Sequence, residues 1–128
     1  MPRTDLRKTS IGFGSLFEGR FTNHEIITID GRAEGSRLEA KEVYIGKTGR
    51  VKADIRADHI IVEGVVIGDI ESSNRVILMP TAKVLGRILT NELIIQRGVI
   101  FEGVCIIRND VKDKSSAEHI KALYEKDE

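Results

Sequence analysis

The chain reads Val51-Lys52-Ala53-Asp54-Ile55 and, 15 residues further on, Val66-Ile67-Gly68-Asp69-Ile70. Each segment has apolar residues at both ends and alanine or glycine in the middle. Copies of this pattern also begin at Phe17, Val84 and Phe101, and a degenerate copy begins at Ala33. A pattern that recurs at a fixed period of this length indicates a solenoid.

A second series of apolar triplets is interleaved with the first. Successive triplets begin 16, 17, 16 and 17 residues apart, so both series share a period near 17. Apolar and polar residues alternate within the five-residue segments, which is typical of strands with one buried face, and 17 residues leave no room for a long helix. We therefore predict an all-β, single-domain parallel β-helix of about six coils. The triplets are Ile27–Ile29, Val43–Ile45, Ile60–Val62, Val76–Leu78 and Leu93–Ile95.

The small residue at the centre of each segment suggests a narrow coil. We expect Ala53, Gly68, Gly86 and Gly103 to point inward, where a larger side chain would collide with the facing wall. Six coils stacked at the strand spacing of ~4.8 Å would form a rod roughly 29 Å long. Each coil of such a rod depends on its neighbours to bury its apolar residues.

The composition excludes several functional classes. The 128 residues include 20 basic and 20 acidic side chains, so no net field attracts nucleic acid or an anionic membrane. No stretch approaches the roughly 20 apolar residues of a membrane span. The first residues lack the apolar run of a signal peptide. We expect a cytoplasmic protein with no nucleic-acid partner.

Three segments, taken in order, resemble the bactofilins, which are bacterial polymer-forming cytoskeletal proteins. They are Phe17-Glu18-Gly19-Arg20-Phe21, Val66-Ile67-Gly68-Asp69-Ile70 and Val99-Ile100-Phe101-Glu102-Gly103. The resemblance implies a right-handed β-helix whose subunits join end to end into filaments without bound nucleotide. It also implies a scaffold for cell shape at the inner face of the cell membrane, with cell-wall-remodelling enzymes or membrane-associated proteins as partners. The N-terminus has no evident apolar membrane-targeting stretch, so direct membrane binding is left open.

The chain divides into a short N-terminal tail (1–10), the β-helix (11–110) and a C-terminal tail (111–128). In the C-terminal tail, Ser115 and Glu118 have the spacing of a helix capping box. The segment is short for a helix in water, so a docked helix and a disordered tail are both open. The residues that would share one apolar helical face are Ala117, Ile120, Leu123 and Tyr124.

The sequence gives little support for an enzyme. The histidines His24, His59 and His119 lack the spacing of metal ligands, and we expect them at the surface. The nearest enzymatic alternative is a β-helical acyltransferase. Such an enzyme needs a strict six-residue rhythm and a catalytic histidine in an inserted loop, and neither is present. We predict no catalytic residue, no metal and no cofactor.

Two other motifs also favour structural roles. Cys105 occupies the position of Ile55, Ile70 and Ile88 in the repeat, so we expect a buried small hydrophobe rather than a nucleophile. The segment Gly46-Lys47-Thr48-Gly49 lacks the spacing and the following helix of a phosphate-binding loop, and we predict a turn.

The ends of the rod are the candidate site for polymerisation. A β-helix ends in unpaired backbone groups and an apolar cross-section, and monomeric solenoids cover these ends with polar caps. Here all four phenylalanines lie in the terminal coils, which is the opposite of capping. The N-terminal contact set is Phe13, Leu16, Phe17 and Phe21, and the C-terminal set is Ile100, Phe101, Cys105 and Ile107.

A lateral apolar stripe is the second candidate surface. The middle residue of each triplet should point outward when its two neighbours point inward. We predict a column along the side of the rod, which could contact another filament or a membrane or be covered by the C-terminal tail. Its members are Tyr44, Ile61, Ile77 and Ile94.

Overall fold

The computed structural model describes residues 8–22 and 26–108. These residues form eleven β-strands and no helix. The strands are β1 (Lys8–Ile11), β2 (Leu16–Thr22), β3 (Ile26–Ile29), β4 (Arg32–Glu39), β5 (Glu42–Ile45), β6 (Arg50–Val62), β7 (Val65–Ile67), β8 (Ile70–Leu78), β9 (Lys83–Thr90), β10 (Glu92–Ile95) and β11 (Ile100–Ile107).

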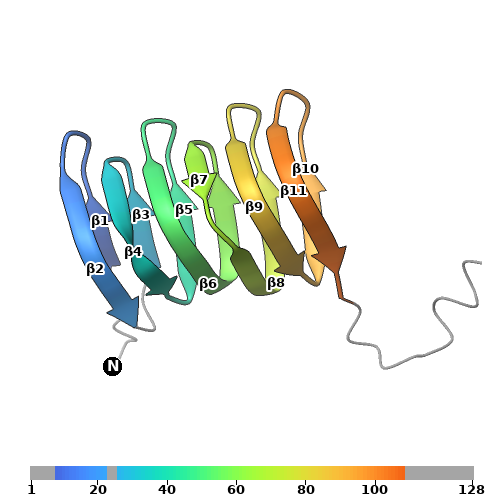
Figure 1. Ribbon diagram of the computed structural model, residues 1–128, viewed down its shortest axis with the longest axis horizontal. Helices are drawn as coiled ribbons and strands as arrows, with labels where there is room; N and C mark the ends of the chain where they lie inside the picture. The colour runs from blue at the N-terminus through green and yellow to red at the C-terminus, as the bar shows by residue number, and fades with distance from the viewer. Residues whose placement is uncertain (1–7, 23–25, 109–128) are drawn as a thin grey trace, which may run out of the picture.

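The strands stack as successive layers of one solenoid (Figure 1). Every strand pairing is parallel, and the residues of the predicted triplets align in register, with Ile27 beside Val43, Val43 beside Ile60, Ile60 beside Val76 and Val76 beside Leu93. The fold is therefore a parallel β-solenoid, as the period predicted. It has about five turns, so the expected six coils were slightly too many.

Each turn of the solenoid has three faces. The first face contains β1, β3, β5, the ends of β6 and β8, and β10. The second face contains the beginnings of β2, β4, β6, β9 and β11, together with β7. The third face contains the remainder of β2, β4 and β11, the middle of β6, the beginning of β8 and the end of β9.

The core fills the interior of the stack. Side chains alternate between buried and exposed along β6, as expected for a strand with one face inside. Ile29, Ile45, Val62 and Leu78 occupy one column and are completely buried. Burying one such side chain stabilises the fold by about 1.5–3 kcal/mol. Because each is covered by the layers on both sides, a stack is stable where a single coil would not be.

The central glycines are required for a reason other than the predicted narrow cross-section. Gly68, Gly86 and Gly103 have φ values of 146°, 144° and 143°, a region that L side chains rarely adopt. A Cβ atom on Gly86 would overlap the carbonyl oxygen of Gly68 in the preceding layer, and one on Gly103 would overlap that of Gly86. Glycine is therefore needed because the bend between the second and third faces stacks backbone directly on backbone. Ala53 alone fits the prediction of an inward, buried side chain.

Extra residues are accommodated where two faces meet. The register between β4 and β6 shifts between Glu34 and Arg37, and that between β6 and β8 shifts between Ala57 and His59. The flat faces keep their alignment because these shifts lie at bends. Ser72, a completely buried polar residue at one such corner, donates a 2.7 Å hydrogen bond from its hydroxyl to the backbone carbonyl of Asp58.

Several predicted features lie outside the described residues. They are the tails up to residue 7 and from residue 109, with the predicted C-terminal helix, and His24 and His119. Within the described part of the chain, no helix is present that could cross a membrane.

Candidate functional site

The C-terminal end of the solenoid is an open edge. In the described residues, β10 pairs only with β8, and β11 pairs only with β9. The outer side of both strands therefore presents backbone N–H and C=O groups with no neighbouring strand. Such an edge is a template for pairing with another chain.

The interior column ends at this edge with apolar side chains that are open to solvent. Ile95 lies beside Leu78 and is 51% exposed, whereas Leu78 is completely buried. Ile107 lies beside the completely buried Thr90 and is 59% exposed. Phe101 lies beside Val84 and packs partly against the core. Among residues 8–22 and 26–108, nothing covers this apolar cross-section.

Cys105 belongs to the same cross-section. It is aligned with the buried Ile88, which confirms its position in the repeat. The expectation of a buried thiol is nevertheless wrong for the single chain, because Cys105 is exposed. The next layer, which would cover it, does not exist among the described residues. The partial burial that remains raises the pKa of the Cys105 thiol, which makes it less nucleophilic at neutral pH.

The N-terminal end is described less completely. Ile11 of β1 is buried, while Phe13, in the turn between β1 and β2, is 80% exposed. Phe17 and Phe21 lie in β2, at the register positions of Ala33 and Leu38 in β4. Among the described strands, β1 pairs only with β3 and β2 only with β4, so this end also has an open edge.

Two of the predicted end residues lie on the side of the rod. Leu16 is aligned with Arg32 and Arg50, and Ile100 is aligned with Lys83, all of them exposed. Both belong to terminal coils, as predicted, but they occupy the outward column of the second face. Ile95 was not predicted as an end residue, although its place as the last residue of the triplet Leu93-Ile94-Ile95 would have identified it.

The lateral stripe forms the predicted column on the first face. Tyr44, Ile61, Ile77 and Ile94 follow one another in register. The first three are half-buried, and only Ile94 counts as exposed. The Tyr44 hydroxyl donates a 2.5 Å hydrogen bond to Glu63 Oε1, and this bond, with burial and nearby carboxylates, raises the pKa of Tyr44 to about 12. A contact role for the stripe stays a prediction.

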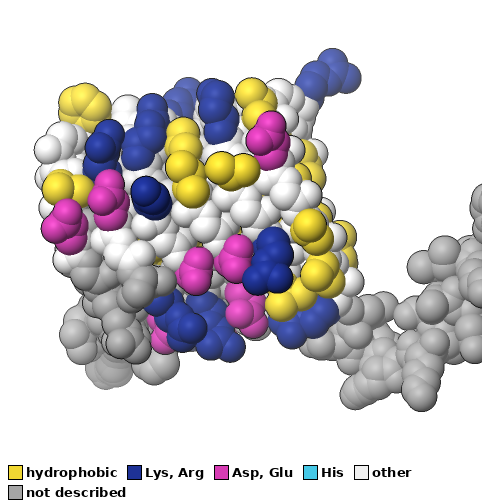
Figure 2. Space-filling model, in the orientation of Figure 1, with side chains coloured by type: hydrophobic (Ala, Val, Ile, Leu, Met, Phe, Trp, Pro, Cys, Tyr) yellow, Lys and Arg dark blue, Asp and Glu magenta, His cyan; other side chains and the backbone are white. Residues whose placement is uncertain are grey.

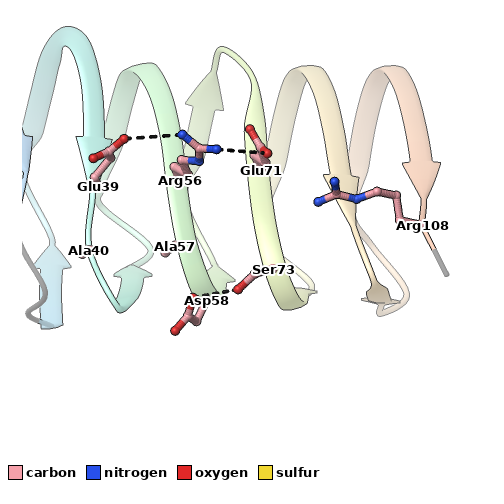
Figure 3. A pocket seen from close by; sticks show the side chains of 8 residues that line it. All are labelled: Glu39, Ala40, Arg56, Ala57, Asp58, Glu71, Ser73 and Arg108. Atoms are coloured by element: carbon pink, nitrogen blue, oxygen red, sulfur yellow. Dashed lines mark hydrogen bonds and ion pairs between the residues drawn. The ribbon is translucent and has the colours of Figure 1, made fainter. Parts of the chain in front are cut away.

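The third face carries a ladder of ion pairs (Figure 3). Arg56 lies between Glu39 and Glu71, at 3.8 and 3.7 Å, above a shallow hollow of about 450 Å³. Asp58 and Ser73 line the same hollow and are joined by a 2.7 Å hydrogen bond. The side chains come from successive layers and satisfy one another, which is the arrangement of a solvated polar face. Exposed pairs of this kind contribute about 0–1 kcal/mol each.

The remaining candidate motifs are the segment 46–49 and His59. The segment from Gly46 to Gly49 is a turn, as predicted, and the N–H of Gly49 donates to the carbonyl of Gly46 at 2.8 Å. The ring of His59 lies 3.4 Å from the Asn74 amide nitrogen. The described residues contain no group of three or more His, Cys, Asp or Glu side chains that could hold a metal ion.

An apolar patch on the second face was missed in the sequence. Ile67 and Leu85 are adjacent outward residues of β7 and β9, and are 42% and 49% exposed. Figure 2 shows hydrophobic side chains gathered over β7 and β9, with Lys or Arg side chains above them and on the β6 side, and an Asp or Glu side chain on the β11 side. The signal was available, because both residues stand at the second position of the five-residue pattern, where other copies carry Glu18, Lys52 and Glu102.

The fold defines a class of protein, a parallel β-solenoid, whose described residues leave an apolar C-terminal end exposed. A family model described as "Bactofilin: Polymer-forming cytoskeletal" matches residues 9–106, so the chain belongs to the bactofilin family. Over 100 residues it is 32% identical to bactofilin BacP and 29% identical to bactofilin BacO, both of Myxococcus xanthus (strain DK1622). Each alignment covers 78% of this chain, with 42% of BacP and 79% of BacO.

The fold also matches a known structure. The atomic structure of the cytoskeletal bactofilin BacA, determined by solid-state NMR, has 27% sequence identity and a TM-score of 0.71. The match covers 80% of this chain and 97% of BacA.

Proposed function

We propose that this protein is a cytoskeletal scaffold whose solenoids stack end to end into filaments without nucleotide. The observation that carries the proposal is the C-terminal cross-section, where Ile95 and Ile107 are exposed although their neighbours Leu78 and Thr90 are completely buried. A second solenoid on this end would cover these side chains and pair the free edges of β10 and β11. The membership in a polymer-forming family supports the same role.

The wider role follows the resemblance to bactofilins. We infer that the filaments act in the cytoplasm, at the inner face of the cell membrane, where they maintain cell shape or hold cell-wall-remodelling enzymes. The proposal assigns the protein no catalytic step and no cofactor. The lateral stripe would then be a side contact of the filament.

The test is a charge placed in the cross-section. Phe101→Arg would bury an unpaired guanidinium between two stacked solenoids, at a cost of several kcal/mol. We expect folded monomers or short oligomers by electron microscopy, with the β-sheet circular dichroism signal retained. The matched control is Glu102→Arg, which introduces the same side chain one residue along β11 at an exposed position.

The two variants have separable outcomes. Filaments of normal length in Glu102→Arg and none in Phe101→Arg would support stacking through this end. Undiminished filaments in Phe101→Arg would overturn it. If Phe101→Arg loses the β-sheet signal, the same experiment is done with Ile107→Arg, because the Ile107 side chain is more exposed in the single chain.

A further inference from the structure

The second face carries a surface that end-to-end stacking leaves uncovered. It consists of the apolar side chains of Val65, Ile67 and Leu85 with the cationic side chains of Arg50, Lys52 and Lys83, and we call it the basic–apolar face. The register places Arg50 beside Val65 and Val65 beside Lys83 in one column, with Lys52, Ile67 and Leu85 in the next. An apolar centre with a polar rim is the usual anatomy of a protein contact.

Four arginines elsewhere on the rod have carboxylate partners, which the cations of this face lack among the described residues. On the third face Arg37, Arg56 and Arg87 pair with carboxylates, and on the first face Arg75 pairs with Glu92. Within the described part of the chain, Lys52 and Lys83 form no ion pair. The guanidinium of Arg50 donates to the backbone carbonyls of Lys47 and Gly49 rather than to a carboxylate. These positive charges are therefore available to an acidic ligand.

A lipid surface fits this face poorly. Glu34 and Glu102 stand at the two ends of the outward column of Lys52, Ile67 and Leu85, so a carboxylate borders the face at each end and opposes any acidic ligand there. The apolar centre spans only two layers, or about 5 Å along the rod axis. A short acidic segment with a few apolar side chains matches this size, and its carboxylates can pair with Arg50, Lys52 and Lys83, which outnumber the two bordering glutamates.

We propose that residues 117–128 of this chain dock on the basic–apolar face. The segment has four carboxylates and two lysines, so its net charge opposes that of the rim. Its larger apolar residues, Ile120, Leu123 and Tyr124, match an apolar centre of similar size. It lies beyond residues 9–106, which the bactofilin family model matches, so the segment is separate from the solenoid on which it would dock.

The length of the chain permits docking within one molecule. Glu102, next to Leu85 in the register, precedes Arg108 by six residues of extended chain, or at most ~20 Å. One further strand spacing brings the distance to ~25 Å. The eight residues 109–116 can span up to ~28 Å. A linker that reaches its site holds the segment there at an effective concentration in the millimolar range.

The basic–apolar face suits this segment better than the lateral stripe does. The stripe is half-buried over most of its length, and Glu63 accepts the hydrogen bond of Tyr44 beside it. Glu42 and Glu92 stand in the adjacent column, with Arg75 already paired to Glu92. An acidic segment on the stripe would meet the carboxylates of Glu42, Glu63 and Glu92, whereas the basic–apolar face sets three cations, which have no carboxylate partner in the described residues, against its two bordering glutamates. The proposal is independent of end-to-end stacking, because the two use different surfaces.

The test is photochemical crosslinking in the full chain. Tyr124 is replaced by the photoreactive p-benzoylphenylalanine, and adducts are mapped by tryptic digestion and fragmentation. We expect an adduct within one chain, on Leu85 in the peptide 84–87 or on Ile67. An adduct on Ile77 in the peptide 76–83 or on Ile61, an adduct between two chains only, or no adduct would overturn the proposal.

Charge variants give a second, graded readout. Lys52→Glu combined with Lys83→Glu should lower the adduct yield about tenfold, because two attractions become repulsions of roughly 1.4 kcal/mol in total. Arg37→Glu combined with Lys41→Glu makes the same change of net charge away from this face, and should change the yield less than about twofold. Raising the salt concentration to about 0.5 M should also weaken the docking several-fold. Equal yields in the two double variants would overturn the charge match.

Discussion

Two adjacent layers of the solenoid carry equivalent residues in very different surroundings. In the layer of β8 and β9, Leu78 and Ile88 are sealed in the core, whereas Ile95 and Cys105, one layer further on, are exposed. The residue types barely differ. The comparison shows that a side chain in a solenoid is buried by the next layer. The apolar side chains of the last described layer therefore stay exposed until another layer covers them.

The largest expected effect compares one column in the two layers. Leu78→Ala removes a completely buried side chain and should lower the free energy of unfolding by about 2–5 kcal/mol. Ile95→Ala changes the half-exposed neighbouring position. In chains that are not assembled into filaments, it should lower the free energy of unfolding by about 1 kcal/mol. Urea unfolding measures both. A similar loss for both variants in unassembled chains would show that the two layers do not differ in burial, and a larger loss for Ile95→Ala in filaments would show that stacking buries Ile95.

The next prediction compares the free energy of unfolding after alanine substitution of a glycine stacked on the backbone of another layer and of a glycine with no atom nearby. Gly86→Ala forces an L residue into a φ of 144° and pushes a Cβ into the carbonyl of Gly68, so we expect a loss of about 2–3 kcal/mol. Gly14, in the N-terminal turn, has a φ of 85° with nothing within 4 Å of its would-be Cβ. Gly14→Ala should therefore cost only about 1–2 kcal/mol by the same unfolding measurement. Equal losses would show that φ alone, and not stacking, requires glycine.

A smaller effect concerns the side of the rod. Tyr44→Phe removes the hydrogen bond to Glu63 and should lower the free energy of unfolding by about 1 kcal/mol at neutral pH. The folded-state pKa of Tyr44 is raised from 10.0 to about 12, so this contribution is complete below pH 10 and is lost as the pH rises towards 12. Unfolding of both proteins across this range checks the sign. A difference that grows with pH would contradict it.

The last prediction concerns no change in stability. It uses the alkylation rate of Cys105 to measure solvent access at the C-terminal end. Cys105 is the single cysteine, so alkylation by iodoacetamide reports on this position alone. Labelling of dispersed chains should be slow at neutral pH and faster at alkaline pH, because the pKa of the thiol is raised. Filaments should be protected at every pH. Equal rates in filaments and dispersed chains would place Cys105 outside the contact.

The sequence was sufficient to predict the architecture because each repeat of the pattern corresponds to one layer of the solenoid. The triplets predicted to stack are aligned residue by residue, and Leu38, one residue late in the degenerate copy, is accommodated by the shift between Glu34 and Arg37. The pattern could not show why glycine is needed at Gly86, because the clash is with the backbone of another layer. It also could not distinguish a column that is covered, such as that of Ile88, from the same column at Cys105 where it ends. The patch at Ile67 and Leu85 was visible as broken alternation, but only the structure shows the two side chains adjacent on one face.

The confinement of register shifts to bends has a consequence for how such a rod can change in evolution. Differences in coil length are accommodated at the corners, at Glu34, Arg37, Ala57 and His59. The register on the flat faces therefore does not depend on how many layers precede a given layer. Duplication or loss of one unit of about 17 residues would lengthen or shorten the rod by ~4.8 Å while both terminal surfaces stay intact. The length of the subunit can thus change by gene duplication while the contacts at its two ends stay compatible.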